Sequence, residues 1–154
     1  MKFITQFSLA LLALTLVACS KKEAPPPPPP PPAVAAPAPD LVNVPVSVKQ
    51  VVLTNSLGAD MKAGAPMTTF APTDTIYAVV ETIGSGNASV KAMWTYHKGE
   101  KSAQVSETMQ ELVLAGPTSS EFHISKPDGW PAGDYQVEIT VNGASAGIQN
   151  FSVK

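Results

Sequence analysis

The sequence predicts an all-β domain in which about seven strands form a two-sheet sandwich. Three observations lead to this prediction. Apolar residues alternate with polar ones in several short runs, glycine and proline separate those runs, and Asn142 and Gly143 lie between the last two. Alternation with a period of two is typical of strands that bury one face. About seven such strands in about 110 residues are typical of a sandwich.

Residues 1–18 are predicted to be a cleaved signal peptide. Lys2 carries the positive charge, and the run 3–17 is almost wholly apolar. A helix that spans a membrane needs roughly twenty apolar residues, so this run is too short for a permanent anchor. Its length and its charged start are those of a removable secretory segment.

The residues that close this run are Leu16, Val17, Ala18 and Cys19. They resemble the lipobox of bacterial lipoproteins. The resemblance implies that diacylglycerol, with acyl chains such as palmitate, is attached to the sulfur of Cys19 and that the chain is cut after Ala18. Ser20, where aspartate would imply retention at the inner membrane, implies the periplasmic face of the outer membrane. The alternative is ordinary secretion, which would leave a reactive thiol exposed at Cys19.

Residues 19–43 are predicted to be a lipidated N-terminus followed by a proline-rich and alanine-rich linker. The stretch 24–39 holds ten prolines among sixteen residues, and 25–32 are all proline. Proline fixes φ and lacks an N–H, so the run of prolines favours a polyproline II rod of roughly 25 Å. We interpret it as a spacer; the alternative is a ligand for an aromatic groove.

Residues 44–154 are predicted to form the single folded domain. From Asp40 onward there are seven lysines and eleven acidic residues, which gives 7 − 11 = −4, and the chain has no arginine. Arginine is the residue best suited to contacts with phosphates and bases, so a nucleic-acid partner is not expected. No cysteine follows Cys19, and no motif indicates a cofactor.

Four runs carry the clearest alternation. They comprise Val44, Val46 and Val48; Ile76, Ala78 and Val80; Val90, Ala92, Trp94 and Tyr96; and Tyr135, Val137, Ile139 and Val141. Asn142 and Gly143 predict a type I′ hairpin, since both central positions of that turn require positive φ. We predict a strand over 104–115, where a helical face is the alternative. Residues 55–67 are either a mobile loop with binding capacity or a simple connection between strands.

The stretch Gly-Asp-Tyr-Gln-Val at 133–137 resembles the strand-F corner of immunoglobulin-like domains. In that family a tyrosine lies two residues before a core cysteine, and a strand-C tryptophan packs on the disulfide. Tyr135 and Trp94 correspond to these aromatic residues. The disulfide positions would be held by Val80 or Ala78 and by Val137, so aliphatic contact would replace the bond. The resemblance implies the immunoglobulin-like fold of bacterial extracytoplasmic modules and little about activity.

Titratable residues give weak indications of chemistry. His97 and His123 are too few for a zinc site, which takes three or four protein ligands; we expect them on exposed sheet faces. Asp128 and Asp134 flank a Trp-Pro pair. We interpret them as turn residues and not as a pair of carboxylates for general acid–base catalysis. No metal site and no catalytic residue is therefore predicted.

Trp130 is the candidate for contact with a partner. It lies in a loop before Pro131, and tryptophan is common among residues that dominate binding energy. The interpretation that we favour is that its ring covers the open end of the sandwich.

These features together predict a non-enzymatic lipoprotein that is anchored in the membrane through its N-terminal lipid. Its domain would bind or scaffold a protein or an envelope polymer in the periplasm. Two alternatives remain: a protease inhibitor of the small β-sandwich type, which needs a rigid protruding loop, and an accessory subunit of an envelope complex.

Overall fold

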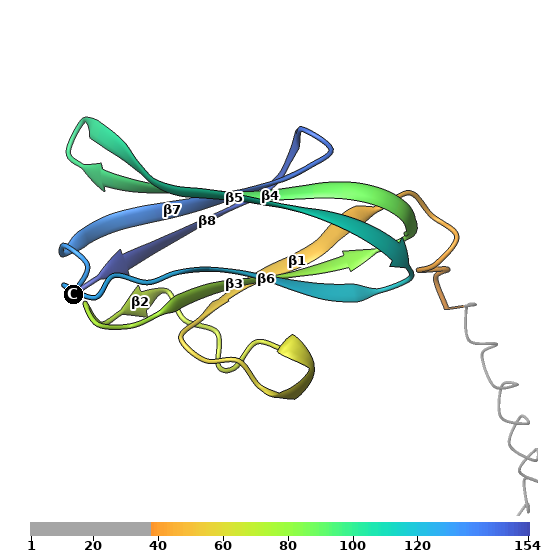
Figure 1. The fold of residues 1–154 in the computed structure, drawn as a ribbon, viewed down its shortest axis with the longest axis horizontal. Helices are drawn as coiled ribbons and strands as arrows, with labels where there is room; N and C mark the ends of the chain where they lie inside the picture. Colours follow the sequence, from red (N-terminus) through yellow and green to blue (C-terminus); the bar gives the residue numbers. More distant parts are fainter. Residues whose placement is uncertain (1–37) are drawn as a thin grey trace, which may run out of the picture. The chain divides into compact units, whose positions relative to one another are not determined.

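The computed structural model describes residues 38–154, so the signal peptide, Cys19 and the run 25–32 lie outside it. The described part is all-β and consists of two stacked sheets (Figure 1), which confirms the predicted sandwich. Its elements are β1 (Ser47–Thr54), η1 (Ala59–Met61, a short 3₁₀ helix), β2 (Thr69–Phe70), β3 (Ile76–Ile83), β4 (Ser85–Lys98), β5 (Lys101–Ala115), β6 (Thr118–Ile124), β7 (Gly133–Val141) and β8 (Ala144–Val153).

One sheet has three strands in the order β1-β3-β6, and the other has five in the order β2-β8-β7-β4-β5. All neighbouring strands run antiparallel except β2, which pairs in parallel with the end of β8. The long β4–β5 hairpin pairs from Ser85 with Ala115 to Lys98 with Lys101. The edge strands are therefore β1 and β6 in one sheet, and β2 and β5 in the other.

The core lies between the two sheets and follows the predicted alternation. Along β7, Tyr135, Val137, Ile139 and Val141 are buried while the residues between them face outward. Trp94 of β4 is completely buried beside Phe151 of β8, with ring centroids 5.9 Å apart. Burial of such large apolar side chains is the main force that holds the two sheets together.

The hairpin between β7 and β8 has the predicted turn. Asn142 and Gly143 have φ angles of 50° and 81°. Both values are positive, as a type I′ turn requires. The Asn142 side chain also accepts a hydrogen bond of 2.9 Å from the backbone N–H of Ser89, which fixes the turn against β4.

The structure resolves the open choice at 104–115, and it differs from the prediction at the start of the domain. Residues 104–115 belong to strand β5, as predicted. The first strand was expected from Val44, yet β1 begins at Ser47. Pro45 has no N–H to donate, and the carbonyl of Val44 instead accepts a hydrogen bond from Ser85, so the chain enters the sheet three residues later. The two-residue strand β2 was not predicted.

Within the described residues, no helix is long and apolar enough to cross a membrane.

Candidate functional site

Trp130 lies at one end of the sandwich with its ring 8% exposed. The ring meets Tyr135 edge-on, with centroids 6.2 Å apart. Its Nε1–H donates to the carbonyl of Asp74 at 3.0 Å, and its backbone N–H donates to the carbonyl of Pro72 at 2.8 Å. The side chain therefore covers the end of the core, as the packing alternative predicted. A contact between Trp130 and a partner stays a prediction.

The two histidines lie on opposite outer faces. His97 is on β4 of the five-stranded sheet, and His123 is on β6 of the three-stranded sheet. His123 Nδ1 lies 3.0 Å from a carboxylate oxygen of Glu121. Residues 38–154 contain no group of three or more side chains that could hold a metal ion.

The two aspartates have different surroundings. Asp128 is in a turn, where its carboxylate lies 3.9 Å from Lys126 Nζ with almost all of its side chain exposed. Asp134 is on β7, between Ser152 of β8 and His97 of β4 in the strand register. Asp134 therefore joins a set of side chains that the sequence alone did not bring together.

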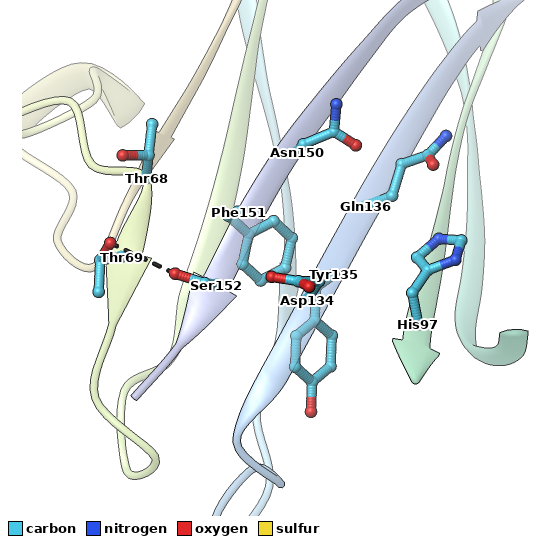
Figure 2. Close-up of a pocket in the computed structure, with 9 residues that line it drawn as sticks. All are labelled: Thr68, Thr69, His97, Asp134, Tyr135, Gln136, Asn150, Phe151 and Ser152. Carbon is cyan, nitrogen blue, oxygen red and sulfur yellow. Dashed lines mark hydrogen bonds between the residues drawn. The ribbon is translucent and has the colours of Figure 1, made fainter. Parts of the chain in front are cut away.

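That set lines a groove of about 540 Å³ on the outer face of the five-stranded sheet. Figure 2 shows side chains from β2, β8, β7 and β4 around this groove. The polar side chains exposed to it are Thr68, Thr69, His97, Asp134, Gln136, Asn150 and Ser152. Thr69 Oγ1 and Ser152 Oγ lie 3.4 Å apart, and Gln136 is paired with Asn150 in the register. The groove thus presents amides, hydroxyls and one carboxylate, which are groups suited to hydrogen bonding with a polar chain.

Two residues that line the groove, Tyr135 and His97, have buried polar atoms or rings. The Tyr135 ring lies in the core below it, where burial, with a smaller contribution from Tyr96, raises the pKa of the Tyr135 phenol. The phenol donates to the carbonyl of Pro131 at 2.8 Å. His97 Nε2 is buried and finds no hydrogen-bond partner among the described residues.

Residues 55–67 form an ordered loop that projects from the sandwich after β1 (Figure 1). Three backbone hydrogen bonds brace it: Gly58 to Lys62 at 2.8 Å, Gly64 to Ser56 at 3.0 Å and Met67 to Leu53 at 2.8 Å. Met61, in η1, is 46% exposed and has a φ of 58°. Residues 55–67 thus form a hydrogen-bonded connection between β1 and β2, and a mobile loop with binding capacity stays a prediction.

The outer face of the five-stranded sheet also carries exposed apolar residues. Met109 and Val113 of β5 are 60% and 86% exposed, and Ile148 of β8 is 50% exposed. Sequence reasoning missed both these residues and the groove, because each surface combines outward positions from strands that are far apart in the chain. Strand alternation gives the outward positions, but only the strand order brings them together.

No protein-family model matches this chain, and no curated protein matches its sequence. Three solved structures are similar over 71% of it. The alkylpurine DNA glycosylase AlkC of Pseudomonas fluorescens, bound to DNA, has 14% identity, a TM-score of 0.46 and 30% of its length covered. A β-glucosidase from intestinal bacteria has 16% identity, a TM-score of 0.46 and 16% covered. A β-glucosidase from Listeria innocua in complex with glucose has 6% identity, a TM-score of 0.43 and 16% covered. This chain thus matches 30% or less of each, and their activities are not carried over to it.

Proposed function

We propose that this chain is a lipid-anchored envelope protein that presents a non-catalytic binding or scaffold domain at the periplasmic face of the outer membrane. The anchor is supported by Leu16, Val17, Ala18 and Cys19, which resemble a lipobox, and the outer-membrane location by Ser20. Two or three acyl chains would hold the protein stably, because each buried CH₂ contributes about 0.8 kcal/mol.

We further propose that the sandwich is immunoglobulin-like. The support is a tyrosine at the start of β7 that bonds back to its own chain: the Tyr135 hydroxyl donates to the carbonyl of Pro131. A tyrosine corner of this kind is a hallmark of the fold. Trp94 is buried on β4, and Val80 and Val137 are buried where the family carries its disulfide.

The binding role rests on one observation, the outer face of the five-stranded sheet. This face combines the polar groove around Asp134 and Gln136 with exposed Met109, Val113 and Ile148. Exposed apolar side chains and convergent polar groups are each typical of surfaces that contact partners. The proposed partner is a protein or an envelope polymer.

Fractionation of cells that express Cys19→Ala tests the anchor. We expect the variant to leave the membrane fraction, and we expect the parent to yield an acyl-modified N-terminal peptide in mass spectra. A variant that stays as firmly bound as the parent, with no acylated peptide from the parent, would contradict the anchor.

Photo-crosslinking in intact cells tests the binding face. A photoreactive residue at position 136 should give adducts with a partner. The matched control replaces Gln50, an exposed glutamine on β1 of the other sheet, and should give none. If position 136 gives no adduct in a correctly fractionating protein, or if position 50 gives the same adducts, the outer face is not the binding surface.

A protease inhibitor is the second candidate, and the braced loop 55–67 favours it. An inhibitor needs a rigid projecting loop, and this loop has internal hydrogen bonds and an exposed Met61. Titration of a panel of secreted proteases with the full chain tests the idea. Inhibition that Met61→Ala weakens would support it. A protein that inhibits none of them, or a Met61→Ala variant that inhibits equally, would exclude this loop as a reactive site.

A further inference from the structure

Strand β5 is a long sheet edge with one strand partner. It spans Lys101–Ala115, contains no proline and pairs with β4 along its length. No other backbone or side chain among residues 38–154 donates to or accepts from the β5 backbone. An edge strand of this kind has backbone N–H and C=O groups that can pair with another chain.

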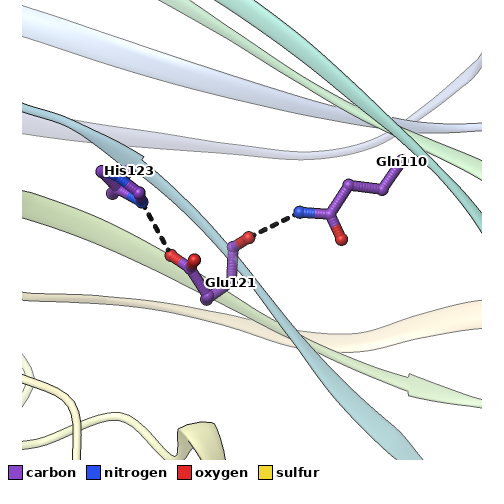
Figure 3. A network of polar contacts seen from close by, with 3 residues as sticks. All are labelled: Gln110, Glu121 and His123. Carbon is purple, nitrogen blue, oxygen red and sulfur yellow. Dashed lines mark hydrogen bonds and ion pairs between the residues drawn. The ribbon is translucent and has the colours of Figure 1, made fainter.

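The other edge strands are shorter, with eight residues in β1, two in β2 and seven in β6 against fifteen in β5. Strand β2 has two residues and pairs with the end of β8. The backbone N–H of Ser152 donates to the carbonyl of Thr68, and that of Lys154 donates to the carbonyl of Phe70. Strand β1 is interrupted by a bulge between Val48 and Gln50. On β6, the carbonyl of Glu121 accepts a 2.8 Å hydrogen bond from Gln110 Nε2, as Figure 3 shows. The β5 edge is thus the longest edge in the described part of the chain.

Over residues 107–113 of β5, the outward side chains alternate between acidic and apolar. They are Glu107, Met109, Glu111 and Val113, which face the same side as Met93 and Lys91 of β4. Lys91 lies 3.6 Å from Glu107, and Glu111 has no such ion pair in the described residues. Asp134 and Glu138 add two more acids to this face from β7. Along 107–113 the edge therefore carries two acids against one base, Lys91, on the neighbouring strand.

This charge pattern disfavours two of the registers in which a second copy of the chain could pair with the edge. Two β5 strands that pair antiparallel about Met109 would place Glu107 of one copy opposite Glu111 of the other. Pairing about Glu111 would place the two Glu111 side chains opposite each other. Like charges that lie directly opposite destabilise a strand pair, and such charges are a usual protection against edge-to-edge self-association.

We propose that the β5 edge binds an extended cationic segment of another protein, which adds a sixth strand to the five-stranded sheet. Backbone hydrogen bonds along the edge supply affinity, and alternate side chains supply specificity. On the outer face, lysine or arginine of the partner lies beside Glu107 and Glu111, and apolar residues lie beside Met109 and Val113. The partner segment therefore reads basic-x-apolar-x-basic-x-apolar, or the reverse in the other strand direction.

The proposal deepens the binding role proposed above and rests on it. The probes are three synthetic peptides added to the full chain in detergent. One alternates lysine, threonine and valine in the predicted order, the second carries glutamate in place of lysine, and the third has the composition of the first in a non-alternating order. Calorimetry gives the affinity, and amide hydrogen exchange shows which β5 amides become protected.

We expect the lysine peptide to bind and to protect alternate amides of β5. The double variant Glu107→Lys, Glu111→Lys should bind it about tenfold more weakly, since two cross-strand charge pairs become repulsive, and should prefer the glutamate peptide. Asp128→Lys is the control for a charge reversal away from the edge, in an exposed turn, and should leave the affinity unchanged.

Four results would overturn the proposal. The first is equal binding of the lysine peptide by the parent and the double variant. The second is equal binding of the non-alternating peptide, which would indicate charge attraction without strand pairing. The third is failure of the lysine peptide to bind, and the fourth is self-association of the chain through β5 in ultracentrifugation. Each leaves the crosslinking test at position 136 intact, so failure here is distinct from failure of the proposed function.

Discussion

The two tryptophans occupy two differently built regions of the core. Trp94 lies in the middle, between the sheets, and its Nε1–H finds no hydrogen-bond partner among the described residues. Trp130 lies at one end, where the loop between β2 and β3 supplies two carbonyl acceptors, those of Asp74 and Pro72. The middle is thus held by apolar packing between strands, whereas the end is held by packing together with directed hydrogen bonds from loops. The burial of Trp94, which lies on a strand, can be predicted from the alternation of apolar residues. The burial of Trp130, which lies in a loop, cannot.

The largest expected effect is at the middle. Trp94→Ala should lower the free energy of unfolding by about 3 to 5 kcal/mol, because it removes the largest side chain of a tightly packed region. Denaturant melts of the full chain measure this. Trp94→Phe is the control and should cost clearly less. A Trp94→Ala variant that melts near the parent would contradict the register of the two sheets.

Trp130→Ala should cost less, about 2 kcal/mol, because the end of the sandwich can collapse over part of the vacated space while the Asp74 carbonyl regains water. The same melts measure it. A loss equal to that of Trp94→Ala would break the distinction between the two regions. A variant that keeps its stability yet loses crosslinked partners would make Trp130 a binding residue instead.

Tyr135→Phe sharpens the comparison, because Tyr135 joins the two regions. Loss of the hydrogen bond to Pro131 should cost about 1 kcal/mol at neutral pH. Burial raises the pKa of Tyr135 in the folded protein, so the unfolded state loses its proton first once the pH exceeds about 10. The stability that the neutral phenol contributes is complete below that pH and is lost as the pH rises further.

Melts of the parent and of Tyr135→Phe provide the measurement. They run from about pH 8 to about pH 11, because the phenol of an ordinary tyrosine titrates within this range. The advantage of the parent should shrink with rising pH. A constant difference would show that the phenol titrates alike in both states.

The smallest effect is expected at Asp40, outside both regions. Its carboxylate accepts hydrogen bonds from the backbone N–H groups of Asn43 and Val42 and from the Asn43 side chain. The bonds from Asn43 contribute most to lowering the pKa of Asp40. The stabilisation is present above the ordinary pKa and is lost as the pH falls through the lowered value. NMR shifts of the Val42 and Asn43 amides should follow this titration and should not follow it in Asp40→Asn. The indole signals of Trp94 and Trp130 should stay constant; if they move, the three regions are coupled.

The strands with the clearest alternation could be predicted from the sequence. Burial in β7 follows Tyr135, Val137, Ile139 and Val141 residue by residue, because a half-buried strand imposes period two on its composition. Asn142 and Gly143 likewise identified their turn, since few residue pairs adopt two positive φ angles.

Other features leave no such local pattern. Strand β2 has two residues and is defined by Thr69 and Phe70 meeting Ser152 and Val153, far along the chain. The polar groove and the uncovered β5 edge depend on which strands become neighbours. Alternation predicts which side of a strand faces outward, but not which strand lies beside it. The membrane anchor depends on residues outside the described part and stays a prediction.

The aromatic side chains of the core also have an optical consequence. Trp94 contacts Phe151 edge-on, Phe151 stacks on Tyr135 at 5.3 Å, and Tyr135 contacts Trp130 edge-on. The excitation energy of Tyr135 can therefore pass to either of two indoles. The indole of Trp130 contacts the Tyr135 ring, and the indole of Trp94 is separated from it by the Phe151 ring. We expect the indole of Trp94, which has no hydrogen bond, to emit at shorter wavelength than that of Trp130, which donates to a carbonyl. The two indoles would then report separately on the middle of the sandwich and on its end.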